Sequence, residues 1–279
     1  MTARTILVSV LFATLIGVFS YAVSKQEPNI FITSPTVSLS SKSANMASVF
    51  FKIKNQASPD ILLSAKSAFA AKTLIEKSEQ FGVTAIPAGS SPIFSSDGIY
   101  LKLLGIRGDL KTGDLVPVTL SFQQAGNVNF KAIVTGKIST DMNHGKHKMD
   151  HSMPKMDHSM PKMDHSTPDM DSICGKYPTP KVSISAKRKP DHSGWRIDVT
   201  TDNFEFIKEQ PDMAHIPGTG HAHVYLNGLK LQRLYGKTVH VGNLLPGRYS
   251  LIVALNTNTH RVYLNNGKPV ISEVILIAE

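Results

Sequence analysis

A seven-residue unit rich in methionine and histidine occurs three times between residues 148 and 168. It reads Lys-Met-Asp-His-Ser-Met-Pro at 148–154 and again at 155–161, and Lys-Met-Asp-His-Ser-Thr-Pro at 162–168. Thioether sulfur is a soft, uncharged ligand that suits Cu(I) far better than zinc, magnesium or calcium, and imidazole binds both oxidation states of copper. The repeats therefore predict a copper-binding segment that favours Cu(I). Silver would bind in a similar way, and nickel or zinc would bind through the histidines alone.

Further methionines and histidines flank the repeats, so that seven of the ten methionines and five of the eleven histidines lie between residues 142 and 170. Each of the first two copies contains Met-x-His-x-Met, which is a complete trigonal ligand set for Cu(I). The third copy has Thr167 in place of its second methionine, so it needs a sulfur from outside the unit. The ligands expected first are Met149, His151, Met153, Met156, His158 and Met160, and those expected second are Met163, His165, Met142, His144, His147 and Met170.

The period of seven does not indicate a coiled coil, because a proline ends every copy. Each proline removes a helical hydrogen bond and costs a helix about 3 kcal/mol. Residues 141–172 almost lack aromatic and β-branched side chains, so we expect a disordered linker. Loosely held ligands exchange metal quickly, which is typical of a carrier or a store. The alternative is that the segment serves only as a tether.

A second group of histidines lies near the carboxyl terminus, in Asp-Met-Ala-His (212–215) and Gly-His-Ala-His (220–223). Residues 221 and 223 of a strand point to the same face and can chelate one ion. We therefore name His215, His221 and His223 as a candidate site for Cu(II) or Zn(II), which His240 and His260 could join. The alternative is that these histidines bond to backbone groups or are solvated.

The amino terminus has the pattern of a secretory signal, with Arg4, an apolar stretch over 6–19, and small residues before a cleavage point after Ala22. We expect residues 1–22 to be removed and the protein to be periplasmic. The competing interpretation is an uncleaved anchor, which would be its only association with a membrane. A single cysteine, Cys174, excludes an internal disulfide framework.

The composition argues against two other classes of protein. The chain of 279 residues carries a formal charge of +9, but its basic residues are scattered and its aromatic content is only 7%, so we expect no nucleic-acid binding. No nucleophile elbow, phosphate-binding glycine loop or His-Glu-x-x-His pattern occurs, so we expect no enzyme. A metalloenzyme built on the second histidine group remains an alternative.

Two regions of short β-branched and aromatic runs, separated by turn residues, surround the linker. Such spacing predicts an all-β protein with two antiparallel sandwich or barrel domains, at residues 31–138 and 178–279. Residues 48–54 alternate between apolar and polar side chains like a half-buried strand, and Asn227-Gly228 predicts a two-residue hairpin. The expected strands are 36–39, 48–54, 61–64, 73–76, 83–86, 100–104, 115–122, 128–134, 182–186, 195–200, 221–226, 229–234, 238–241, 249–254 and 270–277.

The first domain resembles the periplasmic copper chaperone family PCu(A)C, through stretches at 47–55, 84–89, 98–106 and 110–122 in the family's order. The resemblance implies a cupredoxin-like β-barrel and delivery of Cu(I) in the periplasm. The family's site includes a His-x-Met pair just before a Leu-Gly step, where this sequence has Tyr100 and Lys102, and only Met46 remains as a thioether. We therefore do not place the family's metal site on this domain.

Together these patterns predict a periplasmic protein that binds copper ions through its linker and buffers them or exchanges them with a copper-accepting or copper-donating envelope protein. The rival hypothesis is an interaction scaffold that docks an envelope partner and uses the linker as a tether.

Overall fold

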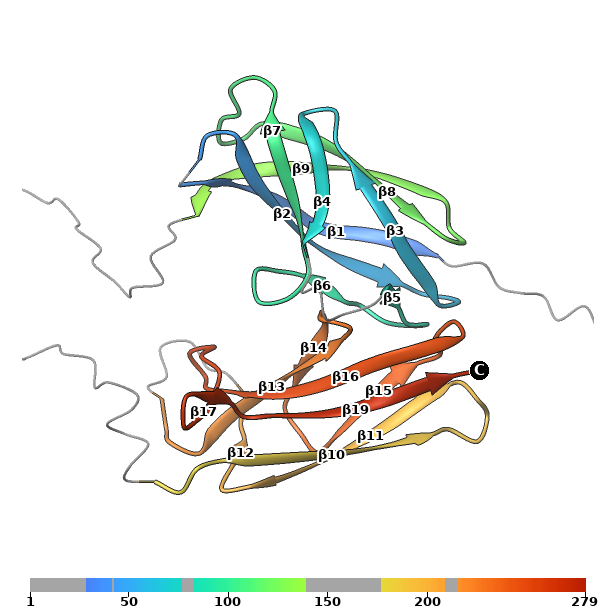
Figure 1. Cartoon of the computed structure of the whole chain (residues 1–279), viewed down its shortest axis with the longest axis vertical. Helices are drawn as coiled ribbons and strands as arrows, with labels where there is room; N and C mark the ends of the chain where they lie inside the picture. The colour runs from blue at the N-terminus through green and yellow to red at the C-terminus, as the bar shows by residue number, and fades with distance from the viewer. Residues whose placement is uncertain (1–28, 42, 77–82, 139–176, 209–214) are drawn as a thin grey trace, which may run out of the picture.

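The computed structural model describes residues 29–41, 43–76, 83–138, 177–208 and 215–279. These residues form strands, turns and irregular segments, and the predicted all-β fold is confirmed. No helix among them is long and apolar enough to cross a membrane. Two groups of strands with separate cores lie one above the other in Figure 1, and we call them the first and second domains. The predicted signal segment (1–22) and the predicted linker (141–172) lie outside the described residues.

The first domain is a barrel-like sheet. Its strands are β1 (Ile30–Ser40), β2 (Met46–Asn55), β3 (Asp60–Lys66), β4 (Ala70–Glu76), β5 (Thr84–Ile86), β6 (Ile93–Phe94), β7 (Tyr100–Ile106), β8 (Leu115–Phe122) and β9 (Asn127–Ile138). They pair in the order β4-β7-β2-β1-β9-β8-β3-β5. The pairs are antiparallel, as predicted, except at one place: β1 and β9 run parallel, with Thr36 opposite Ile133.

Alternating side chains fill the interior of this barrel, as the sequence pattern predicts. Val49, Phe51 and Ile53 of β2 are buried, while the side chains between them face outwards. Phe51 stacks on Phe94 of β6 with ring centroids 4.3 Å apart. Packing of this kind stabilises the domain mainly through the apolar area it removes from water.

The second domain is a sandwich of two sheets. Its strands are β10 (Lys181–Arg188), β11 (Gly194–Asp202), β12 (Glu205–Phe206), β13 (Thr219–Leu226), β14 (Leu229–Leu234), β15 (Thr238–Gly242), β16 (Gly247–Asn256), β17 (Leu264–Asn265), β18 (Lys268–Pro269) and β19 (Ile271–Ala278). One sheet has the order β19-β16-β13-β14, with β12 parallel to β13, and the other has the order β10-β11-β15. Trp195 of β11 is buried between them. The predicted hairpin at Asn227-Gly228 is confirmed, with φ of 47° and 80°.

The two domains also share a sheet, because β6 of the first domain pairs with both β2 and β14. Ile93 lies opposite Lys52 on one side and Lys230 on the other. Figure 1 shows β5 and β6 on the side of the first domain that faces β14. The backbone N–H of Ala88 donates to the carbonyl of Asn243 across the interface, at 2.9 Å. The domains therefore touch along ordered backbone as well as side chains.

One glycine makes this contact close. Gly242, the last residue of β15, lies so near the carbonyl of Ala88 that a Cβ atom at this position would collide with it. Because the obstacle is backbone, a larger residue would have to push the domains apart. Asn227 adds a side-chain contact, since its Nδ2 donates to the carbonyl of Val83 at 3.0 Å.

Candidate metal centre at the domain interface

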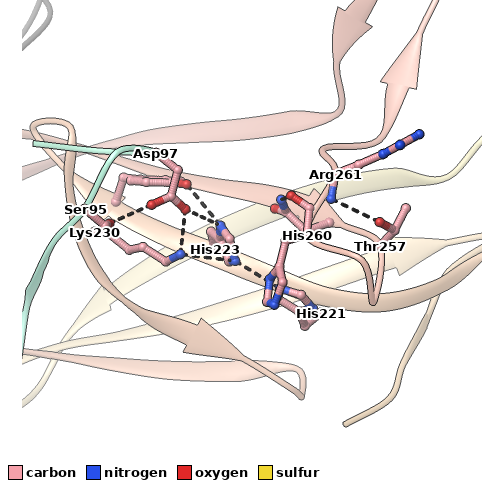
Figure 2. Close-up of polar contacts among 10 residues, drawn as sticks. Ser95, Asp97, His221, His223, Lys230, Thr257, His260 and Arg261 are labelled. Atoms are coloured by element: carbon pink, nitrogen blue, oxygen red, sulfur yellow. Dashed lines mark hydrogen bonds and ion pairs between the residues drawn. The ribbon is translucent and has the colours of Figure 1, made fainter. Parts of the chain in front are cut away.

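Three histidines of the second domain converge beside the first domain (Figure 2). His221 and His223 alternate along β13, where Ala222 and Val224 face the sandwich core, so both rings lie on the opposite face. They are 0% and 2% exposed, which excludes the interpretation that they are solvated. The Nε2 atoms of the two rings are 2.9 Å apart. One ring nitrogen each of His221, His223 and His260 lies within 4.8 Å of the others.

His260 reaches this group from the turn that follows β16. The N–H of Thr257 donates to the carbonyl of Arg261, and the N–H of His260 donates to the carbonyl of Thr257. His260 has a φ of 64°, a left-handed conformation that few residues other than glycine adopt. The turn thus holds a non-glycine residue in an unfavourable backbone conformation at the edge of the cluster.

The register of β13 and β16 brings this turn to His221. His221 lies directly opposite Asn256, the last residue of β16. The preceding Gly220 has a φ of 155°, and a Cβ there would collide with the carbonyl of Asn256. Only glycine therefore allows the two strands to approach at the point where the histidines meet.

The first domain contributes a carboxylate, Asp97, from the turn between β6 and β7. Its Oδ2 accepts from the Nζ of Lys230 at 2.6 Å and lies 3.2 Å from the Nδ1 of His223. The hydroxyl of Ser95 donates to its Oδ1 at 2.6 Å. The hydroxyl of Tyr225 is 3.1 Å from the same Nδ1 of His223. Asp97 therefore connects the first domain to both a candidate ligand and a buried lysine.

The electrostatics of the cluster favour neutral imidazoles. Burial, with the neighbouring charges of His223, His260, Arg233 and Lys230, lowers the pKa of His221 to about 3. Burial also lowers the pKa of His223, although the hydrogen bond to Asp97 opposes this shift. For Asp97, burial favours the neutral acid, but hydrogen bonds from His223, Lys230 and Ser95 outweigh it and hold the pKa well below its usual range. At neutral pH His221 and His223 thus offer uncharged nitrogen ligands beside a carboxylate.

A cleft of about 980 Å³ lies between the domains at this point and gives the cluster an entry path. Asp97, His223 and His260 line it, together with basic side chains of both domains, including Lys52 and Arg261. The lining also includes His240, which is exposed on β15.

This arrangement can hold a borderline metal ion such as Cu(II) or Zn(II), for which neutral imidazole is a preferred ligand. Two nitrogens about 2.0–2.1 Å from one ion are about 2.9 Å apart at the right angle of a square-planar Cu(II) site. The spacing of the Nε2 atoms of His221 and His223 equals that value. The described residues thus contain one group of three histidines whose chemistry and spacing fit a metal.

The structure brings together two of the three histidines that the sequence grouped here and separates the third. His215 is absent from the cluster, and its ring lies against Tyr263, whose hydroxyl is 3.5 Å from its Nε2. The prediction that His215 belongs to the candidate metal site is therefore wrong. His215 is close to His221 in the sequence but not in the folded structure. His260, named only as able to join, takes that place.

Sequence reasoning missed Asp97 and Lys230. Asp97 lies in a short Ser-Asp-Gly sequence between two predicted strands, and its partner Lys230 lies 133 residues away. The predicted ligands of the repeats lie outside the described residues; they are Met142, His144, His147, Met149, His151, Met153, Met156, His158, Met160, Met163, His165 and Met170.

The positions of the family's His-x-Met pair carry other interactions in the first domain. The ring of Tyr100 packs against Phe50, with centroids 5.8 Å apart. The ammonium of Lys102 lies 3.4 Å from a carboxylate oxygen of Glu76. Neither side chain is a copper ligand of the family's type.

Residues 30–134 match the model of the LpqE-like family. The match covers the first domain and confirms its predicted relationship to the PCu(A)C type. No curated protein sequence matches the chain.

Solved structures similar to this chain include the copper-bound PCuAC domain from PmoF2, with 26% identity and a TM-score of 0.35, over 42% of this chain and 97% of that one. The apo PCuAC domain from PmoF1 has 21% identity and a TM-score of 0.37, over 39% and 96%. Apo-DR1885 from Deinococcus radiodurans has 20% identity and a TM-score of 0.33, over 50% and 95%.

Proposed function

We propose that this protein binds copper outside the cytoplasm and buffers it or passes it to another envelope protein. The observation that carries the proposal is the convergence of the buried His221 and His223 of β13 with the exposed His260 of the turn after β16, whose ring nitrogens lie within 4.8 Å of one another. Neutral imidazoles at this spacing suit Cu(II).

The Met–His repeats supply a second kind of ligand for the other oxidation state. We propose that residues 142–170 bind Cu(I), because Met-x-His-x-Met offers the soft ligands that this ion prefers. The match of the first domain to the LpqE-like family supports a role in the cell envelope, and a copper-bound PCuAC domain is among the similar structures. The signal-like pattern of residues 1–22 supports export.

The proposal is one of binding and transfer, with no catalytic step. A metalloenzyme would require turnover that depends on His221 and His223 and survives deletion of residues 141–172. An interaction scaffold would require partner binding that survives removal of every ligand in those residues.

Copper titration of the full chain tests the proposal with two variants. In one, every Met and His between residues 142 and 170 is replaced by Ser; in the other, His221, His223 and His260 are replaced by Gln. We expect the first variant to lose most Cu(I) equivalents, measured by competition with a chromophoric chelator under reducing conditions. We expect the first variant to keep a nitrogen-ligated Cu(II) signal in electron paramagnetic resonance, and this signal to disappear when the second set of changes is combined with the first.

The matched control is His192→Gln, which removes an exposed histidine of the same domain. It should change neither measurement. The proposal would be refuted if the native protein bound neither Cu(I) nor Cu(II) at micromolar concentration.

A further inference from the structure

Asp97 lies at the meeting point of the domain interface and the histidine cluster. We propose that the metal centre belongs to both domains: Asp97 of the first domain holds His223 of the second in its ligating orientation, so metal binding and domain docking strengthen each other. This inference rests on the proposed copper binding at His221, His223 and His260.

The hydrogen-bond network assigns the proton on His223. The ammonium of Lys230 lies 3.3 Å from the Nε2 atom, and an ammonium group can only donate, so Nε2 is the acceptor. The proton of the neutral ring is then on Nδ1, which lies 3.2 Å from the carboxylate of Asp97 and 3.1 Å from the hydroxyl of Tyr225. In the metal-free protein this Nε2 atom is therefore engaged by Lys230 and by the Nε2 of His221, which lies 2.9 Å away (Figure 2), and a metal bound to it would take the place of these contacts.

A carboxylate that accepts the remote N–H of a metal-bound histidine is a common supporting group. It fixes the tautomer and the ring orientation, and its loss typically weakens metal binding 10- to 100-fold. Here the supporting carboxylate comes from a different domain than the ligands, so its effect depends on how the domains are docked. Asp97 is thus a positioning residue that acts through His223.

The first domain holds Asp97 in a defined place. The N–H of Ser95 donates to the carbonyl of Ile99 at 3.0 Å, and the N–H of Gly98 donates to the carbonyl of Ser95 at the same distance. The turn meets the second-domain hairpin closely, since a Cβ on Gly98 would lie 3.1 Å from the carbonyl of Gly228. The position of the carboxylate relative to His223 is therefore set by the interface.

Thermodynamic linkage makes the coupling reciprocal. If docking places Asp97 on His223 and thereby strengthens metal binding, a bound metal must stabilise the docked arrangement by the same factor. The effect should be visible in the first domain, which supplies none of the three metal ligands.

The first part of the test measures the affinity of the full chain for Cu(II). The Met and His residues of 142–170 are replaced by Ser, so that only binding at the histidine cluster is measured. Asp97→Ala should bind Cu(II) 10- to 100-fold more weakly, and Asp97→Asn, which keeps an acceptor but loses the charge, should fall between this variant and the native protein. Gly242→Ala, which obstructs the contact with Ala88 and touches no ligand, should also bind more weakly.

Two control variants match these changes. Asp109→Asn alters an exposed acid of the first domain, and Gly236→Ala adds a methyl group where no atom lies within 4 Å. Both should bind Cu(II) like the native protein. Circular dichroism and Trp195 emission check the fold, and if Gly242→Ala fails to fold, the two Asp97 variants carry the test.

The second part measures hydrogen exchange of residues 83–99 in the first domain. Cu(II) should slow exchange there in the native protein and leave it unchanged in Asp97→Ala, a result that a merely structural role of Asp97 would not produce. Native-like affinity in both Asp97→Ala and Gly242→Ala, with no effect of metal on exchange, would overturn the inference while leaving copper binding intact. Absence of Cu(II) binding at the cluster of the native protein would overturn both proposals.

Discussion

The two domains share an all-β architecture and differ in their metal chemistry. Residues 30–138 contain no histidine and one methionine, whereas residues 178–279 contain six histidines. The domain that resembles a copper chaperone thus lacks the family's His-x-Met pair, and the converging histidines lie in the other domain. What the first domain offers is a carboxylate, Asp97, that contacts a ligand of the second.

This contrast shows that the fold and the metal site are separate properties of a chain. The barrel needs buried alternating side chains, and β2 and β8 keep them. A ligand pair occupies only two outward positions of β7, and Tyr100 and Lys102 fill these without disturbing the core.

The largest effect is expected from giving the first domain the ligands it lacks. Ser48 lies opposite Lys102 and Met46 opposite Leu104, so Met46, Tyr100 and Lys102 share one face of the paired strands. Tyr100→His with Lys102→Met, in a chain whose linker ligands are replaced by Ser, should add one Cu(I) equivalent in a chelator competition.

The stability cost of this double change should be small, because the lost ion pair of Lys102 with Glu76 is partly exposed. The control is Thr119→His with Ser121→Met, which places the same pair of residues on half-buried positions of β8. It should not add a Cu(I) equivalent. If both double variants bound an additional Cu(I) ion, the number of His and Met residues, and not their position on β7, would explain why the two domains differ.

The next largest effect is expected from replacing His260, a candidate ligand of the second domain that has an unfavourable backbone conformation. His260→Gly relieves the left-handed φ of 64° and removes one imidazole. Cu(II) affinity should fall at least about tenfold while the Tm stays the same or rises. His260→Gln keeps the backbone strain and should lose affinity without the gain in Tm. Unchanged affinity in both variants would remove His260 from the site.

The sequence predicts the local part of this architecture well. Alternation identifies the buried side chains of β2, and Asn227-Gly228 identifies a hairpin, because both signals depend on neighbours along the chain. The same alternation places His221 and His223 on one face. Strands of two residues, such as β6, give no periodic signal and were missed.

The remainder depends on contacts between distant segments. His215 was grouped with His221 because the two are close in sequence, yet the turn before β13 leaves it beside Tyr263. His260 lies 39 residues beyond His221 and reaches it because β13 pairs with β16. The contact of Asp97 with Lys230 depends on how two separate surfaces fit together, which no pattern within either segment encodes.

A smaller effect should follow from removing the positive charge beside the cluster. The ammonium of Lys230 lies 3.3 Å from the Nε2 of His223 and therefore repels a cation bound there. Lys230→Met keeps most of the hydrocarbon packing and should bind Cu(II) about tenfold more tightly at fixed pH, measured by competition with a chelator. Lys237→Met, an exposed lysine of the same domain, should have no effect. Weaker binding by Lys230→Met would show that its contact with Asp97 matters more than its repulsion.

The smallest effect is a pH dependence of stability that should appear in the second domain alone. The pKa of His221 is about 3 in the folded protein, below the usual 6.5, and burial is the main cause. Between these values the unfolded chain binds more protons than the folded one, so stability must fall as the pH is lowered. From pH 7 to pH 5, above most carboxyl titrations, the free energy of unfolding of the metal-free second domain should fall by on the order of 1 kcal/mol, or its Tm by a few degrees.

The fluorescence of Trp195, the only tryptophan, reports unfolding of this domain, and the first domain has no histidine to titrate. His221→Gln should make the profile shallower, with the remaining slope due to His223 and His215, whose pKa values burial also lowers, and His192→Gln should preserve it. A flat profile in the native protein would mean that His221 is not shielded from water as the structure places it.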